Sequence, residues 1–242
     1  MSHQDDERSP GGSPILRHER DVQAPTVEGE VCLEQISAHI AAHLGPVAWV
    51  FHELVSDRVH IDVHVVMPTP ERPFIRLVTS GMSDLPMTVP PDVAAPRHLE
   101  LMITLPPHWR VDKESFQDPA WYWPVRLLKS LARLPHLYGT WLGWGHTVPN
   151  GGPAEPYAPD VGFAGAIVLP PASAPDAFRT LDIAPGKQIT FLSVWPLLPG
   201  EMDYKLLRGT EALVQRLRGA RVSDVVDPSR KDAAVRRRFR WF

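Results

Sequence analysis

Four short segments rich in β-branched and aromatic residues follow one another in the first half of the sequence, and they constrain the fold more than any other feature. Such a composition is typical of β-strands. Hairpin-like spacings separate the first three segments, so we expect antiparallel pairing, and the mostly apolar fourth segment should be central. The segments are VAWVFHEL from residue 47, VHIDVHVV from 59, FIRLVTSG from 74 and HLELMITLP from 98.

Further strands and three helices are predicted around these segments. The helices have apolar residues at helical spacing, and Pro124 fits the second helix only within its first turn. Strands gathered before and after a helix, without regular βαβ alternation, predict an α+β domain. We expect a single domain with a largely antiparallel or mixed β-sheet flanked by helices. The predicted helices span 31–44, 121–134 and 201–219, with Gly219 as a C-terminal cap, and the further strands are WLGWGHTVP from 141, GFAGAIVLP from 162 and QITFLSVWPL from 188.

The two ends of the chain differ in composition from the middle. Residues 1–29 are rich in Ser, Gly, Pro and charge, so they cannot offset their ordering entropy by burial, and we predict a disordered leader. Residues 30–228 form the predicted domain. Residues 229–242, SRKDAAVRRRFRWF, form a predicted basic tail.

Composition also narrows the class of protein. A formal net charge of −3 gives no reason to expect nucleic acid as a partner. The single cysteine, Cys32, excludes an internal disulfide, which favours a reduced cytoplasm. No apolar run is long enough to span a membrane, and the first residues lack the pattern of a signal peptide. We therefore expect a cytoplasmic protein without a membrane partner.

The stretch HIDVH at residues 60–64 is the strongest indication of an enzyme. On a strand, His60, Asp62 and His64 would share one face, and imidazole and carboxylate are ligands of zinc and non-haem iron. The outer two Cα atoms would lie about 13 Å apart, however, which is too far for one ion. A pair could bind a metal with help from elsewhere, but the polar face of a strand is the better interpretation.

Other candidate sites are weaker. In FHELVSD, His52 and Glu53 are adjacent on a strand and point to opposite faces, so they cannot act together. Aromatic residues at 121–123, 141 and 144 could stack on bases, but basic residues among them are sparse, which favours a core or interface role. No nucleotide-binding or nucleophile-elbow motif is present. We expect no catalytic residue, no metal ligand and no cofactor.

The stretch GHTVPNGGPAEPYAP at residues 145–159 sets one histidine among turn-forming residues. Its prolines stiffen the exit of the loop, which suits recognition better than chemistry. We interpret it as a structural turn, with a rim that contacts a partner as the alternative. The candidate contacts are His146, Asn150, Glu155, Tyr157 and Asp160.

Several blocks of the sequence together resemble the bacterial suppressor of fused domain. The resemblance spans roughly residues 31–228, and TSGMSD, LPHLYGTWLGWGHTVPNG and VSDVVDP are its most distinctive stretches. The other matching blocks are HELVSDRVHIDVHVVMPTPERPF, ELMITLPPHW, YWPVRLLKSLARLPH and MDYKLLRGTEALVQRL.

The resemblance implies one α+β domain like the N-terminal lobe of the animal Hedgehog-pathway regulator, which helps to hold Gli-type transcription factors by pairing with an extended peptide. This chain has no length for the second lobe of that clamp, so Gli binding does not transfer. Bacterial members are thought to be immunity proteins that neutralise toxins. The family supplies no catalytic residues.

Three functional hypotheses follow. The leading one is a non-enzymatic protein-binding domain, an immunity or scaffold protein that occludes a partner such as a toxin encoded nearby. The alternative is a metal-dependent hydrolase that uses His60, Asp62 or His64 with His146. A third hypothesis, peptide binding by strand addition at a sheet edge, differs from the first in geometry rather than class.

Overall fold

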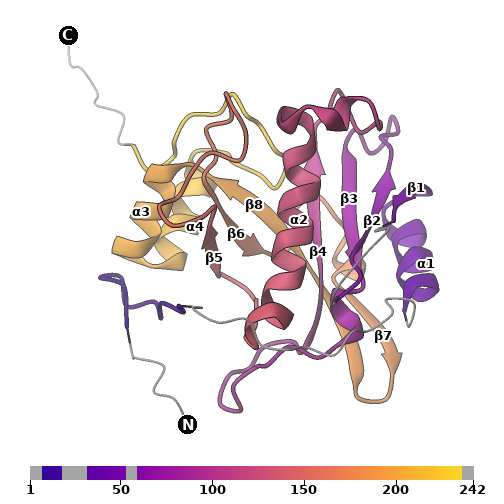
Figure 1. The fold of residues 1–242 in the computed structure, drawn as a ribbon, viewed down its shortest axis with the longest axis horizontal. Helices are drawn as coiled ribbons and strands as arrows, with labels where there is room; N and C mark the ends of the chain where they lie inside the picture. Colours follow the sequence, from indigo (N-terminus) through magenta and orange to yellow (C-terminus); the bar gives the residue numbers. More distant parts are fainter. Residues whose placement is uncertain (1–6, 18–31, 53–58, 236–242) are drawn as a thin grey trace.

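The computed structural model describes residues 7–17, 32–52 and 59–235, and Figure 1 shows one mixed sheet between helices. The predicted α+β class is confirmed. The helices are α1 (Leu33–His43), α2 (Pro119–Tyr138), α3 (Pro199–Arg208) and α4 (Thr210–Gly219), with short 3₁₀ turns at Met82–Asp84, Ser115–Gln117 and Asp176–Phe178. The strands are β1 (Val47–Phe51), β2 (Asp62–Val66), β3 (Ile75–Ser80), β4 (His98–Leu105), β5 (Thr147–Pro149), β6 (Gly165–Leu169), β7 (Thr180–Ala184) and β8 (Lys187–Leu197).

The sheet runs in the order β1-β2-β3-β4-β8-β6-β5, and β7 pairs with β8. All of these pairs are antiparallel except β4 with β8. The hairpin-like spacing of the first three strands therefore predicted their pairing correctly, and β4 lies inside the sheet as expected. Glu53, and Ser56-Asp57, which divide the first two predicted strands in the sequence, lie outside the described residues.

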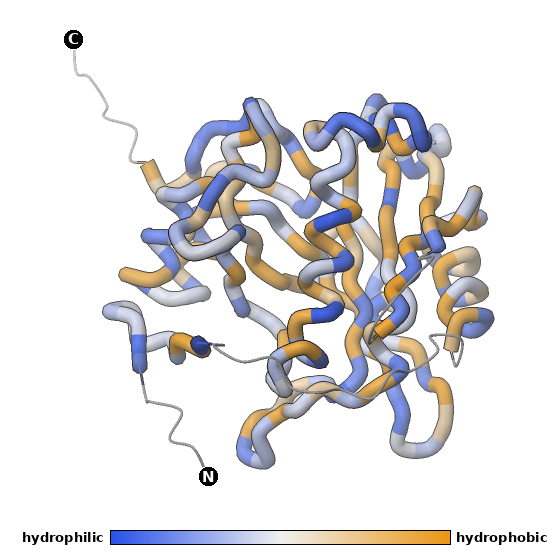
Figure 2. Tube along the Cα trace, viewed as in Figure 1, coloured by the Kyte–Doolittle hydropathy of each residue, from blue (hydrophilic) through white to orange (hydrophobic). Residues whose placement is uncertain are grey.

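Both faces of the sheet are covered, which is why β2, β3 and β6 are buried along their whole length. Helix α2 packs through Trp123, Leu128 and Leu131 on the larger core. Ile36 and Ile40 of α1 pack on the opposite face, and Leu213 and Leu217 of α4 pack beside β6. Figure 2 shows hydrophobic residues along the strands and polar residues in the connecting loops.

Three details differ from the predictions. Helix α2 begins at Pro119, with Asp118 as its N-cap, so Pro124 lies beyond the first turn. The predicted helix 201–219 is two helices, because Gly209 has φ 83° between α3 and α4. Of WLGWGHTVP, only the last three residues form a strand.

The two ends of the described chain both contact the α3–α4 region. Within the predicted leader, residues 7–17 form a turn with an Arg8–Pro14 bridge, and the Gly11 amide donates to the Leu206 carbonyl at 2.8 Å. Within the predicted tail, Arg230 is held by a buried carboxylate on α3. The remaining leader and tail residues lie outside the described part, so the domain boundaries stay a prediction.

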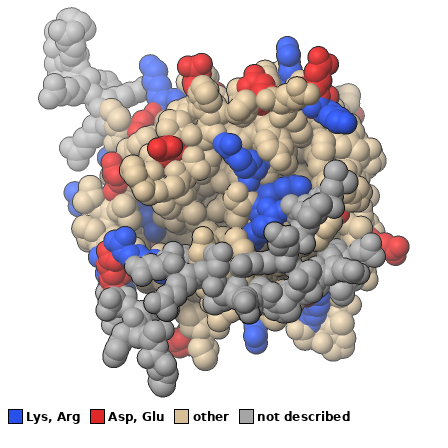
Figure 3. All heavy atoms as spheres, viewed as in Figure 1, with Lys and Arg blue, Asp and Glu red and all other residues tan. Residues whose placement is uncertain are grey.

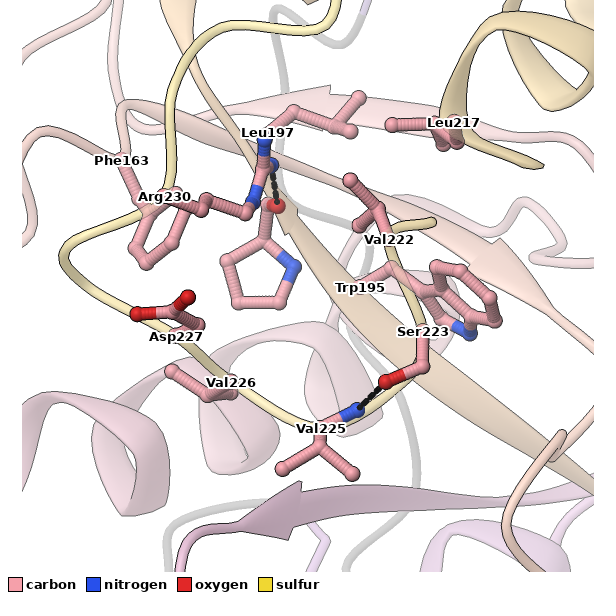
Figure 4. A pocket seen from close by; sticks show the side chains of 11 residues that line it. Phe163, Trp195, Leu197, Leu217, Val222, Ser223, Val225, Val226, Asp227 and Arg230 are labelled. Carbon is pink, nitrogen blue, oxygen red and sulfur yellow. Dashed lines mark hydrogen bonds between the residues drawn. The ribbon is translucent and has the colours of Figure 1, made fainter. Parts of the chain in front are cut away.

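The Arg230 guanidinium holds the C-terminal segment against α3 and β8. Its nitrogens lie 2.5 Å and 2.7 Å from the two oxygens of Glu201, and it donates to the Pro196 carbonyl at 2.9 Å. It also lies over the Phe163 ring, and Figure 4 shows it among the apolar side chains of a small cavity. This arrangement fills the space that the segment encloses and serves packing rather than ligand binding.

Candidate protein-binding surface

The HIDVH residues do not converge on one point. His60 Nε2 lies 2.9 Å from one Asp62 oxygen, and His52 Nδ1 lies 2.8 Å from the other. His64 instead pairs with Ser80 on the neighbouring strand β3. Among the described residues, no group of three or more His, Cys, Asp or Glu side chains is arranged to hold a metal ion.

The His52–Asp62 pair could not be found from the sequence one segment at a time. In the sequence, the candidate partner of His52 is its neighbour Glu53, and adjacent residues of a strand are expected to point to opposite faces. The carboxylate partner of His52 is Asp62 of β2, because β1 and β2 pair with Phe51 opposite Val63. Only the register of two strands provides that signal.

The His64–Ser80 pair has the separation of a base and a nucleophile but not the access. His64 Nε2 lies 2.9 Å from Ser80 Oγ, and both residues are buried. Burial lowers the pKa of His64 to about 4. Its other ring nitrogen has no partner, so no carboxylate orients the ring as a catalytic triad requires. A substrate could not reach this pair.

The distinctive TSGMSD stretch supports a buried polar cluster. The carboxylate of Glu100 accepts hydrogen bonds from the Thr79 hydroxyl at 2.5 Å and from the Ser83 hydroxyl and amide. Burial raises the pKa of Glu100 to about 7 and that of Asp84 to about 6. Gly81 has φ 102°, and a Cβ there would lie 1.9 Å from the His60 carbonyl oxygen, so only glycine fits. The TSGMSD stretch therefore contributes to the packed interior of the domain.

His146 lies apart from the HIDVH residues. Its ring packs on Trp141 with centroids 4.2 Å apart, and its backbone bonds to Gly143 and Val168. Burial, with the charge of Lys205, lowers the pKa of His146 to about 4, so the ring is neutral at physiological pH. The structure therefore does not bring together the residues of the hydrolase hypothesis.

Asn150 closes the loop that follows β5. Its side-chain amide donates to the carbonyls of Glu155 and Pro156 at 2.8 Å and 3.2 Å, and its own carbonyl accepts from the Glu155 amide. Gly151, with φ 89°, makes the turn. Asn150 thus holds the loop in shape, in agreement with its interpretation as a turn residue.

A groove lies between this loop and the start of α2. It is open to solvent and has a volume of about 770 Å³. Tyr157 is only 4 % exposed and stacks on Trp123, so its ring anchors the loop, while Glu155 and Asp160 are exposed. Arg126 donates to the Tyr157 carbonyl. We call this the loop groove, and it is lined by Pro119, Arg126, Asn150, Glu155, Pro156, Tyr157, Ala158, Pro159 and Asp160.

Strand β5 ends the sheet next to the loop groove. The Asn150 amide donates inward to Ala164 of the β6 side, and β5 pairs with β6 in antiparallel register. Because backbone groups alternate in direction along a strand, those of Thr147 and Pro149 point to the open edge. Proline has no N–H, so Thr147 carries the one outward donor of this strand.

An apolar shoulder adjoins the other end of β5. The Thr210 hydroxyl lies 3.3 Å from the Gly145 carbonyl, which joins the loop before β5 to the α3–α4 junction. Three large apolar side chains are exposed here: Trp144 at 49 %, Leu206 at 37 % and Leu207 at 57 %. Exposed apolar clusters beside an open strand are typical of protein interaction sites. Together, the shoulder, the β5 edge and the loop groove are called the β5 strip.

The face in Figure 3 carries acidic and basic side chains side by side, with a small basic group in its middle, where α2 lies. Among the described residues, no helix is long and apolar enough to cross a membrane. The fold and this surface define a class: an α+β domain that presents a sheet edge and an open groove at β5, while His64, Ser80 and Glu100 are buried.

Comparison with known proteins identifies the family. The family model of the suppressor of fused protein (SUFU) matches residues 57–231, and the chain belongs to this family. SUFU proteins are regulators and scaffolds, not a known enzyme family. The resemblance seen in the sequence is thereby confirmed. No curated protein matches the chain by sequence.

Solved structures share the fold at low sequence identity. A protein from Neisseria gonorrhoeae FA 1090 described as a SUFU homolog has a TM-score of 0.62 and 16 % identity, covering 84 % of this chain and 97 % of its own. The structure of a Sufu-Fu complex gives a TM-score of 0.57 and 13 % identity, with coverages of 87 % and 93 %. Drosophila Suppressor of Fused gives a TM-score of 0.44 and 14 % identity, with coverages of 66 % and 38 %.

Proposed function

We propose that this chain is a non-enzymatic protein-binding domain that holds its partner on the β5 strip. The single observation that carries the proposal is the continuity of that strip. The exposed Trp144 precedes the open edge at Thr147, and Asn150 follows that edge and lines the loop groove. The exposed Leu207 of α3 adds to the apolar end, since Thr210 joins the α3–α4 junction to Gly145. A partner segment that pairs with β5 would contact apolar side chains at one end and polar groups at the other.

The residues with catalytic chemistry support a binding role by their position. The base and the hydroxyl of the His64–Ser80 pair are buried, and His146 is held neutral against Trp141. A reaction site needs a nucleophile, a base and room for a substrate together. The described residues provide no such combination.

We further propose that the chain is an immunity or scaffold protein of the cytoplasm and that its partner is a protein such as a toxin encoded nearby. Support comes from the family and from a family structure whose name describes a protein complex, the Sufu-Fu complex.

Capture of the partner, followed by surface variants, tests the binding role. Leu207→Glu places a charge in the shoulder and should weaken the captured complex at least about tenfold, because a buried charge without a partner is costly. Met67→Glu is the matched control, since Met67 is 38 % exposed outside the strip. Equal loss in both variants, or no loss in either, would contradict binding at the shoulder.

The toxin role has a separate test. Each neighbouring gene product is expressed with and without this chain, and growth is measured. We expect one product to arrest growth and this chain to restore it. Failure of rescue for every neighbour that arrests growth rejects the immunity role and leaves the scaffold role.

A further inference from the structure

Helix α3 runs alongside β5, and contacts at both of its ends show this. Near its start, Met202 lies against Gly165, since a Cβ built on Gly165 would be 2.8 Å from the methionine sulfur. Gly165 is paired with Pro149, the last residue of β5. Just past its end, Thr210 reaches the Gly145 carbonyl before β5. The middle of α3 therefore lies level with Thr147.

Lys205 occupies this middle position and is only 6 % exposed. Among the described residues, no hydrogen bond or ion pair is made by its ammonium group. Glu201, one turn earlier, is not available, because Arg230 and the amides of Leu198 and Ala233 occupy its carboxylate. The nitrogen is not among the fully enclosed unpartnered atoms, so it still meets solvent.

The electrostatics of this region agree with the placement of Lys205 near the start of β5. Burial lowers the pKa of Lys205, and the lysine charge in turn helps to lower the pKa of His146, the residue directly before β5. Thr147 pairs with Ile167, whose side chain belongs to the core under α4, so Thr147 faces the same side of the sheet as α3. From these contacts we infer that Lys205, which has no partner among the described residues, lies on the side of β5 from which a group bound to the outward Thr147 amide can be reached.

We propose that Lys205 and the Thr147 amide together bind a carboxylate of an extended peptide that adds to the β5 edge. This inference rests on the proposed function and specifies the partner as an acidic peptide segment. A carboxylate matches the two donors in charge and number: one oxygen accepts from the ammonium and the other from the amide. Pairing would also give a counter-charge to a lysine that is largely, though not fully, removed from water.

The test uses the full chain and a phage-displayed random dodecapeptide library. Peptides selected by the wild type should carry Asp or Glu at one preferred position. For a selected peptide, the Glu→Gln version should bind at least about tenfold more weakly, because a charge-assisted hydrogen bond is lost. Addition of the peptide should slow hydrogen exchange of the Thr147 amide.

Three variants show whether Lys205 is responsible. Lys205→Met keeps the aliphatic stem and should bind the acidic peptide and its Gln version equally, whereas Lys205→Arg should retain the preference. Arg208→Met is the matched control, since it removes an exposed charge one turn away on the same helix. Thermal unfolding of each variant confirms the fold.

The outcomes separate the two claims. Selected peptides without acidic preference, or a preference that survives Lys205→Met, would overturn the carboxylate site while peptide binding at β5 stands. If the wild type selects no peptide that protects Thr147, strand addition itself is rejected, and the carboxylate site with it.

Discussion

At the scale of single residues, buried charges distinguish this chain most clearly, and each has an identifiable partner or an identifiable lack of one. Glu201 is fully buried and paired with Arg230, and Glu100 is fully buried among hydroxyl and amide donors. Lys205 is nearly buried and has no counter-ion within the described part of the chain. These positions are therefore where substitutions should have the largest effects.

Arg230→Met should destabilise the fold by about 3–5 kcal/mol, because Glu201 would remain buried without its counter-charge. The free energy of unfolding in urea measures this effect. Lys231→Met, which removes a neighbouring exposed charge, should change it by less than about 0.5 kcal/mol. Adding Glu201→Gln to Arg230→Met should recover part of the loss. An unchanged stability for Arg230→Met would show that the C-terminal segment is not held by this pair.

Glu100 should make stability fall as pH rises. Its pKa is raised from 4.5 to about 7 in the folded chain, so the protonated form is favoured by folding. The resulting contribution is fully present below about pH 4.5 and is lost as pH rises through about 7. Glu100→Gln should remove this slope, because an amide can still accept from Ser83 and can donate to Thr79.

The pH dependence of unfolding is compared between wild type and Glu100→Gln. The comparison is needed because buried histidines change the stability with the opposite sign. Because the pKa values of His64 and His146 are lowered to about 4, their contribution to the stability of the fold is lost as pH falls below about 6.5. Both proteins contain them, so the difference between the curves isolates Glu100 and its repulsion with Asp84. A constant difference from pH 4.5 to 8 would contradict the raised pKa.

At the scale of elements, the sequence predicted which helices and strands are present better than it predicted where they begin and end. The first four strands and the helix at 33–43 were found because their apolar patterns are strong. Strand β7 was missed because its residues are half exposed and it pairs only with β8. The α3–α4 break depends on a positive φ at Gly209 that periodicity does not reveal.

The candidate site was predictable only in part. The loop after β5 and its turn residue Asn150 could be read from proline and glycine spacing. The roles of Lys205, Leu207 and the Thr147 edge could not, because they depend on the packing of α3 beside β5, which is distant in sequence. Tyr157 reads as a contact residue in the sequence, whereas stacking on Trp123 buries it.

Pro149 should limit what the β5 edge can bind. It removes an outward donor, which is a common protection of edge strands against self-association. Pro149→Thr restores that N–H and should increase self-association, measured as the weight-average mass by sedimentation over a range of protein concentrations. Pro153→Thr, in the loop beyond the strand, is the control. Equal masses for Pro149→Thr and wild type would show that this edge is closed by other means.

At the scale of the whole molecule, the family match covers strands β2 to β8 and most of the closing C-terminal segment, but not α1, β1 or the N-terminal turn. The family match spans residues 57–231, so residues 7–17 lie outside it, although Gly11 contacts the α3–α4 junction directly. A Cβ on Gly11 would lie 2.6 Å from the Gly209 amide nitrogen, which makes the contact specific for glycine. This turn therefore lies beside the same junction that supports the β5 strip.

Binding on the β5 strip is tested most directly by hydrogen exchange of the full chain with and without the captured partner. We predict slower exchange at the Thr147 amide and across residues 144–150, with little change around His60 and His64. Protection centred on His52, His60 and Asp62, with unchanged exchange at Thr147, would contradict a partner site on the β5 strip.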